Sequence, residues 1–127
     1  MTDSLRILYV EDEDDIRQVA IYALEDDFVI EPCSSGQEAL DKAAVFKPDL
    51  VLLDVMMPSM DGPTTLEELK KITGMETVPV VFLTAKVQAG EIDELKAFGA
   101  VDVIAKPFDP MTLGDQIRAI LEASRAR

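Results

Sequence analysis

The chain has 127 residues, 48% of them apolar, and carries 25 acidic against 12 basic residues for a net charge of −13 at pH 7. A chain of this length can bury the core of one globular domain. Its negative charge repels nucleic-acid backbones and anionic membrane surfaces. We therefore expect a single domain over residues 1–127 that neither binds nucleic acid directly nor inserts into a membrane.

Histidine is absent and Cys33 is the one cysteine. The sequence therefore excludes a histidine-based catalytic triad, a histidine metal site and an internal disulfide. Residues 1–6 have acidic character and precede an apolar run of strand length, unlike a signal peptide. We expect the chain to be cytoplasmic.

Strand-like apolar runs alternate with helix-like runs along the chain. Short apolar runs are typical of buried strands, whereas apolar residues spaced i, i+3, i+4, i+7 indicate amphipathic helices. In chain order the sequence predicts a strand at 8–10, a helix at 16–24, a strand at 28–33, a helix at 35–46, a strand at 50–53, a helix at 61–74, a strand at 80–83, a helix at 90–98, a strand at 101–105 and a helix from 113 onward.

Pro32 constrains how these strands are ordered. It lacks the amide hydrogen that a central strand needs, so the strand at 28–33 belongs at a sheet edge. Five βα units with right-handed crossovers form a doubly wound sheet, and the order 2-1-3-4-5 places the second strand at the edge. We predict a flavodoxin-like α/β fold with a five-stranded parallel sheet in that order and five helices.

Polar residues follow four of the predicted strands at the point where each strand ends. Glu11 and Asp12 follow the first strand, Asp54 the third, Thr84 the fourth and Lys106 the fifth. The carboxyl ends of parallel strands meet at one edge of the sheet, where open α/β folds bind ligands. We expect these acids, the hydroxyl and the amine to converge on a divalent cation and a phosphoryl group.

Three carboxylates within several Å of one another repel, and a cation among them relieves the repulsion. Oxygen ligands without histidine or thiolate favour a hard ion, and Mg²⁺ also bridges to phosphate oxygens. Alternatively, the acidic run 11–15 stabilises the amino terminus of a helix through the helix dipole. A calcium-binding EF-hand loop is disfavoured because Arg17 stands where that loop, counted from Asp12, needs glycine.

Each of the other polar residues has a structural alternative. Asp54 can attack phosphorus as a nucleophile, or it can simply begin a turn before Pro58. Thr84 can donate to a phosphoryl oxygen or cap a helix. Lys106 can neutralise phosphoryl oxygens or remain a solvated lysine. Their arrival at different strand ends in one register is what favours the functional interpretation.

Four motifs carry a family resemblance, namely Tyr9-Val10-Glu11-Asp12-Glu13, residues 49–62 (DLVLLDVMMPSMDG), Leu83-Thr84-Ala85 and Val103-Ile104-Ala105-Lys106-Pro107-Phe108. Together they make the chain similar, over essentially its whole length, to response-regulator receiver domains of the stand-alone, chemotaxis-regulator type. The combination of motifs is highly specific.

The resemblance implies a role for each site residue: Asp54 as phosphoacceptor; Asp12, Asp54 and the carbonyl of Met56 as Mg²⁺ ligands; Glu11 acting through a bound water; and Thr84, the Ala85 amide and Lys106 as holders of the phosphoryl oxygens. It also implies a cis peptide between Lys106 and Pro107. A sensor histidine kinase or a histidine phosphotransfer protein would supply the phosphoryl group, and small acyl phosphates would substitute for it.

The sequence departs from the family at the position three residues before the lysine. Similar proteins carry tyrosine or phenylalanine there, whereas this chain has Val103, which has no ring to swing inward. We expect the threonine shift to pass through the following loop and the fourth helix. Met56 and Lys86 stand where similar proteins vary the side chains that control water access, and we expect Met56 to exclude water and slow phosphate loss.

The leading hypothesis is a response regulator in which Mg²⁺-dependent transfer to Asp54 switches a protein-binding face or relays the phosphoryl group onward. We expect a phosphoacceptor with intrinsic autophosphorylation and autodephosphorylation chemistry, not a turnover enzyme. Because Arg127 closely follows the last predicted helix, we expect no covalent output domain and an unknown downstream protein partner.

Three alternatives belong to other functional classes. A phosphohydrolase of the haloacid dehalogenase type places a second aspartate two residues after the nucleophile, where this chain has Met56. A degenerate receiver would bind partners without phosphate, although all five pocket residues are present. A nucleotide- or flavin-binding domain is the weakest, because no glycine-rich loop follows the first strand.

Overall fold

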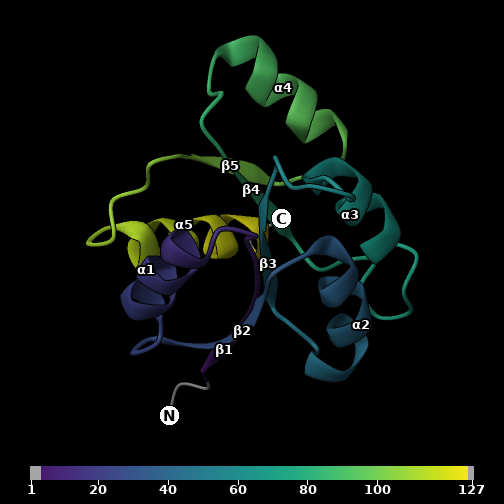
Figure 1. The fold of residues 1–127 in the computed structure, drawn as a ribbon, viewed down its shortest axis with the longest axis horizontal. Coiled ribbons are helices and arrows are strands. Elements are labelled where there is room, and N and C mark those ends of the chain that lie inside the picture. The colour runs from purple at the N-terminus through teal and green to yellow at the C-terminus, as the bar shows by residue number, and fades with distance from the viewer. Residues whose placement is uncertain (1–3, 126–127) are drawn as a thin grey trace.

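The five apolar runs form five parallel strands, and a computed structural model of the chain describes residues 4–125. Helices alternate with the strands along the chain (Figure 1). The elements are β1 (Leu5–Val10), α1 (Asp14–Leu24), β2 (Phe28–Cys33), α2 (Gly36–Phe46), β3 (Leu50–Asp54), α3 (Gly62–Leu69), β4 (Val80–Thr84), α4 (Ala89–Ala97), β5 (Asp102–Ala105) and α5 (Leu113–Arg125).

The sheet has the order β2-β1-β3-β4-β5, which confirms the predicted doubly wound topology. Pro32 lies on the edge strand β2 and is paired with Tyr9 of β1. The missing amide of Pro32 therefore faces the open edge, as expected from its chemistry. The central strands β3 and β4 are buried along their whole length, since helices cover both faces of the sheet.

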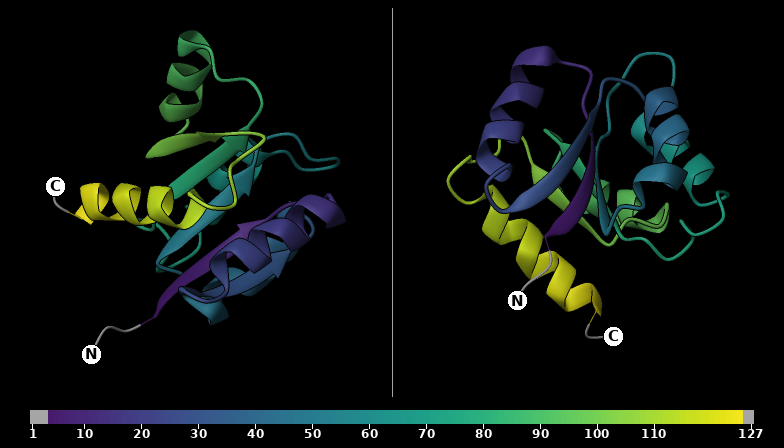
Figure 2. Two further views of the ribbon diagram at one scale, coloured as in Figure 1. Left: turned by 90° about the vertical axis from the view of Figure 1, so that its left-hand side faces the viewer. Right: turned by 90° about the horizontal axis from the view of Figure 1, so that it is seen from below.

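Two hydrophobic clusters fill the spaces between the sheet and its helices. Side chains of α2, α3 and α4 pack on one face, and side chains of α1 and α5 pack on the other. In the right-hand view of Figure 2, α1 and α5 lie on one side of the sheet and α2 and α3 on the opposite side. Alternate side chains of β1 point to opposite faces of the sheet. Leu8 and Val10 pack in the cluster beneath α2, α3 and α4, and Ile7 and Tyr9 pack in the cluster beneath α1 and α5. This packing fixes the strand ends that carry the polar residues.

The predicted helix over residues 61–74 is too long by more than one turn, because α3 ends at Leu69. Beyond it the amides of Lys71 and Ile72 donate to carbonyls only three residues back, at 3.2 and 3.0 Å, which tightens the chain. The ammonium of Lys70 donates to the Val78 carbonyl at 2.7 Å and holds the following loop against the end of the helix. The tighter turns keep Ile72 packed against the core without continuing the helix.

Candidate functional site

Strand register brings the predicted polar residues to one edge of the sheet. Val10, the last residue of β1, pairs with Leu53, so the following Glu11 lies beside Asp54. Asp54 pairs with Leu83, which puts it next to Thr84 at the end of β4. Lys106 directly follows β5, and its amide donates to the Thr84 carbonyl at 2.9 Å. The four strand ends are therefore held together by the backbone.

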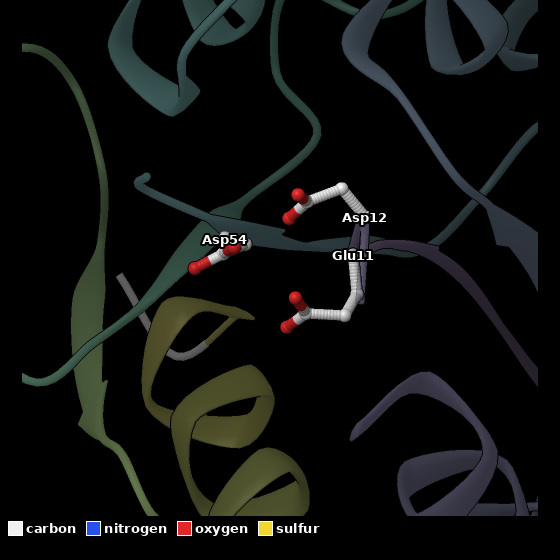
Figure 3. A group of neighbouring side chains, drawn as sticks. All are labelled: Glu11, Asp12 and Asp54. Carbon is white, nitrogen blue, oxygen red and sulfur yellow. The ribbon is translucent and has the colours of Figure 1, made fainter. Parts of the chain in front are cut away.

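Three carboxylates meet in the space beyond the ends of β1 and β3. One oxygen from each of Glu11, Asp12 and Asp54 lies within 4.8 Å of the others. Figure 3 shows the side chains of Glu11 and Asp12 extending to the side on which the Asp54 carboxylate lies. Glu11 is fully buried and Asp54 is 3% exposed. Three anions so close together and so poorly hydrated repel strongly unless a positive charge joins them.

Lys106 supplies one such charge. Its ammonium lies 2.9 Å from Glu11 Oε1 and 3.0 Å from Asp54 Oδ1. Burial lowers the pKa of Lys106, but hydrogen bonds to Glu11 and Asp54 outweigh burial and raise it overall. Lys106 is therefore charged at neutral pH and bridges two of the three acids.

One lysine does not neutralise the pocket. Burial raises the pKa of Glu11 to about 7; Lys106 opposes this rise and the Asp54 charge adds to it. Asp12 Oδ1 is buried, and no donor within residues 4–125 reaches it. A carboxylate oxygen without a donor, next to two more carboxylates, is a fitting ligand set for a hard divalent cation. The residues present thus fit the metal that the sequence predicts.

Thr84 and Ala85 lie where the sequence places them, at the end of β4. The Thr84 side chain is 3% exposed, and its hydroxyl accepts a hydrogen bond from the Lys86 amide at 3.1 Å. This bond closes a local turn and is not a helix cap, because α4 begins at Ala89 with Gln88 as its N-cap. It leaves the hydroxyl proton free to donate elsewhere. Ala85 is exposed on the adjoining loop.

Within residues 4–125, the remaining predicted residues form no side-chain hydrogen bond or ion pair with the three acids. Met56 is 68% exposed on the loop after β3, so its expected role in excluding water stays a prediction. Val103 is half-buried and packs against the cluster beneath α2, α3 and α4. Lys86 is exposed on the loop after β4. The Lys106–Pro107 peptide is cis, as the resemblance implies.

Two residues that support the site were not identified as site residues from sequence. Arg17 donates to the Glu11 carbonyl at 2.8 Å and so fixes the loop that carries the acids. Gly62 begins α3 close behind the end of β3, where a Cβ atom would lie 2.7 Å from the Asp54 carbonyl oxygen. The glycine in the Asp61-Gly62 pair was a signal for this close approach, but it predicted only a helix start.

An apolar surface borders the acidic pocket on the side of α1. This surface forms a hollow of about 390 Å³. The hollow is lined mainly by Ile16 and Val19 of α1 and by Pro107 and Phe108 after β5. Lys106 and Ala85 form its boundary with the pocket.

Comparison with known proteins gives a consistent family match. The family model for the response regulator receiver domain matches residues 7–118. Among curated relatives, the transcriptional regulatory protein CseB of Streptomyces coelicolor is 37% identical, over 95% of this chain and 51% of its own length. The alkaline phosphatase synthesis transcriptional regulatory protein PhoP of Bacillus subtilis is 38% identical, over 94% and 49%. The chain thus spans about half the length of these relatives.

Solved structures agree with this match. The chemotaxis protein CheY4 of Vibrio cholerae has a TM-score of 0.87 and 30% identity, covering 93% of this chain and 99% of its own. NtrX from Brucella abortus has a TM-score of 0.86 and 29% identity, covering 98% of this chain and 29% of its own. In the described part of this chain, no helix has the length and apolar character needed to cross a bilayer.

Proposed function

This chain belongs to the response regulator receiver domain family, and on that basis we propose that Asp54 accepts a phosphoryl group, which switches a protein-binding face of the chain or is relayed onward. The family acts in two-component signalling, in which histidine kinases phosphorylate response regulators. The observation that supports the proposal for this chain is the ion-paired cluster of Asp54, Glu11 and Lys106 beside Asp12.

The proposed reaction is a transfer between two proteins. An Asp54 oxygen attacks phosphorus in a phosphohistidine of the partner. The new P–O bond forms as the P–N bond breaks, and the imidazole, already protonated on its other ring nitrogen, leaves as a neutral group. Lys106, already within reach of Asp54 Oδ1, neutralises the charge that develops on the phosphoryl oxygens. Thr84 and the Ala85 amide, from the end of β4, donate to the remaining oxygens. Catalysis is mainly positioning and charge stabilisation.

Mg²⁺ is the proposed cofactor. Asp12, Asp54 and the Met56 carbonyl would hold it, with Glu11 acting through a water molecule. Bound there, it would neutralise the acids and the incoming phosphoryl oxygens. The donor-free Asp12 Oδ1 is the feature of this chain that favours the assignment.

The partner that supplies the phosphoryl group is proposed to dock on the apolar surface lined by Ile16, Val19, Pro107 and Phe108. A sensor histidine kinase or histidine phosphotransfer protein seated there would present its phosphohistidine next to Asp54. The apolar side chains of this surface could form the buried core of such an interface, and Lys106 places the surface next to the phosphoacceptor pocket.

The proposal is tested by incubating the full chain with acetyl phosphate and Mg²⁺ and measuring its intact mass. We expect a gain of one phosphoryl group that requires Mg²⁺ and is absent in Asp54→Ala. No mass gain, or an unchanged gain in Asp54→Ala, would overturn the proposal. We also expect no sustained hydrolysis of phosphate monoesters, because the chain is proposed to be a phosphoacceptor and not a turnover enzyme. If a histidine-bearing partner protein then removes the phosphoryl group from the chain, the chain acts in a relay.

A further inference from the structure

Helix α4 is held to the rest of the molecule by few side chains. Leu95 is its one buried residue, whereas every other helix in residues 4–125 buries at least two. In Figure 1 it lies at the top of the view, beyond α3. The surfaces of α3 and α4 and the loops after β3 and β4 enclose a groove of about 420 Å³. We call this the α3–α4 groove.

Large apolar side chains stand partly uncovered in the α3–α4 groove. Phe98, at the end of α4, is 50% exposed, and Met56, on the loop after β3, is 68% exposed. Leu95 and Val55 also contribute apolar atoms to the lining. When a partner covers exposed apolar area in a concave site, the burial of that area stabilises the complex. The groove thus has the apolar floor of a peptide-binding site.

The lining of the groove is also strongly acidic. Its acids are Asp61 just before α3, Glu67 on α3, and Glu91 and Glu94 on α4, whereas Lys86 is the one basic side chain of the lining. None of these four carboxylates forms an ion pair within residues 4–125. Elsewhere many surface acids do pair, for example Glu38 with Lys42 and Glu68 with Lys71. The groove acids are therefore available to pair with positive charge on a partner.

We propose that the α3–α4 groove binds a basic segment of a partner protein, which places apolar side chains against Phe98 and Met56 and lysine or arginine against the groove acids. A second copy of this chain is a poor occupant because both copies carry a net charge of −13. Nucleic acids and anionic membranes are repelled for the same reason. A groove between two helices suits an amphipathic helix with its apolar face inward.

The probe for this proposal is a short synthetic amphipathic helix of leucine and lysine, titrated into the isotope-labelled full chain at about 150 mM salt, where long-range attraction is screened. Chemical shift changes in the NMR spectrum are expected to cluster at the loops and helices of the α3–α4 groove. A peptide of the same composition, scrambled to remove the apolar face, is expected to bind weakly. Equal binding of both peptides, or changes spread over the acidic surface, would overturn the proposal.

Matched variants separate the groove from the overall charge. Replacing Glu67, Glu91 and Glu94 by Gln is expected to weaken binding about tenfold, since each is a rim charge. A control with the same change in charge, Glu25→Gln with Asp26→Asn and Glu122→Gln, alters exposed acids outside the groove and is expected to leave affinity within about twofold. An equal loss in both triple variants would refute the assignment.

The apolar contribution is tested in the same titration. Phe98→Ser is expected to weaken binding, whereas Tyr22→Ser, which alters an exposed aromatic residue on α1, is not. Melting temperatures of all variants show whether each still folds. No phosphorylation is needed for this test, so its result is independent of the proposal for Asp54.

Discussion

At the scale of single residues, Glu11 decides how the site responds to pH. It is fully buried beside the Lys106 ammonium, and burial raises its pKa to about 7 from an ordinary 4.5. Between these two values the folded chain keeps a proton on Glu11 that the unfolded chain has released. The stabilisation from this group is therefore complete below pH 4.5 and is lost as the pH rises through about 7.

We predict that the variant Glu11→Gln, which keeps a neutral side chain at every pH, overtakes the wild type in stability as the pH rises. Without metal, the two should unfold at similar urea concentrations near the low end of the range, about pH 5. By about pH 8 the wild type should be less stable by on the order of 1–3 kcal/mol. Urea titrations of both chains at the two pH values measure this, and the difference between the chains cancels the titration of groups that do not interact with Glu11.

Magnesium provides the control for that experiment. A bound cation stabilises ionised Glu11, so saturating Mg²⁺ should remove most of the penalty in the wild type at about pH 8. If the wild type and Glu11→Gln kept the same stability difference from low to high pH, the elevated pKa would be wrong.

At the scale of elements, the distance between α3 and β3 controls the position of the strand end that carries Asp54. Gly62 allows the start of α3 to approach so closely that a Cβ atom would lie 2.7 Å from the Asp54 carbonyl and 2.8 Å from the Val55 Cα. These contacts are with backbone, which cannot rotate away as a flexible side chain does. The helix or the strand end must therefore shift if a side chain is added here.

We predict that Gly62→Ala destabilises the chain by about 1–3 kcal/mol and slows its reaction with acetyl phosphate, because overpacking moves the end of β3. The matched control is Gly90→Ala in α4, where a Cβ atom meets nothing within 4 Å. There alanine should be neutral or stabilise by up to about 1 kcal/mol, since it is the better helix former. Chemical denaturation and the rate of mass gain measure both effects, and similar behaviour of the two variants would contradict the role of Gly62.

The same scale shows what the sequence predicts well and what it does not. The strand over residues 28–33 and its edge location followed from local chemistry, because Pro32 affects only its own pairing. The end of α3 did not, because it depends on tertiary hydrogen bonds from Lys70 to the loop carbonyls of Glu76 and Val78. Hydrophobic spacing through Ile72 continued beyond the real helix and hid that end.

The candidate site divides in a similar way. Strand ends identify which residues converge, so the acids, Thr84 and Lys106 were predictable from sequence. The elevated pKa of Glu11, the bridging position of Lys106 and the close approach at Gly62 depend on distances between elements. The α3–α4 groove likewise depends on how far α4 lies from α3, which no periodicity in the sequence encodes.

At the scale of the whole molecule, the excess of acidic residues destabilises the folded chain through self-repulsion. The net charge is −13, and three acids of that excess are concentrated around one pocket. Any salt screens the repulsion among charges spread over the surface. The repulsion among the three pocket acids is relieved only by a cation that fits the pocket. The two contributions therefore respond differently to the identity of the ion.

We predict that sodium chloride raises the melting temperature modestly and that magnesium chloride raises it further at equal ionic strength. A ligand at about one hundred times its dissociation constant stabilises by about 2.7 kcal/mol, which is enough to separate the two salts. In Asp12→Asn, which removes one charge from the pocket, the metal-free chain should melt higher than the wild type. Its additional response to magnesium should disappear while its response to sodium chloride remains. A variant that kept the full magnesium response would remove Asp12 from the metal site, because the surviving effect would then come from screening or from other carboxylates.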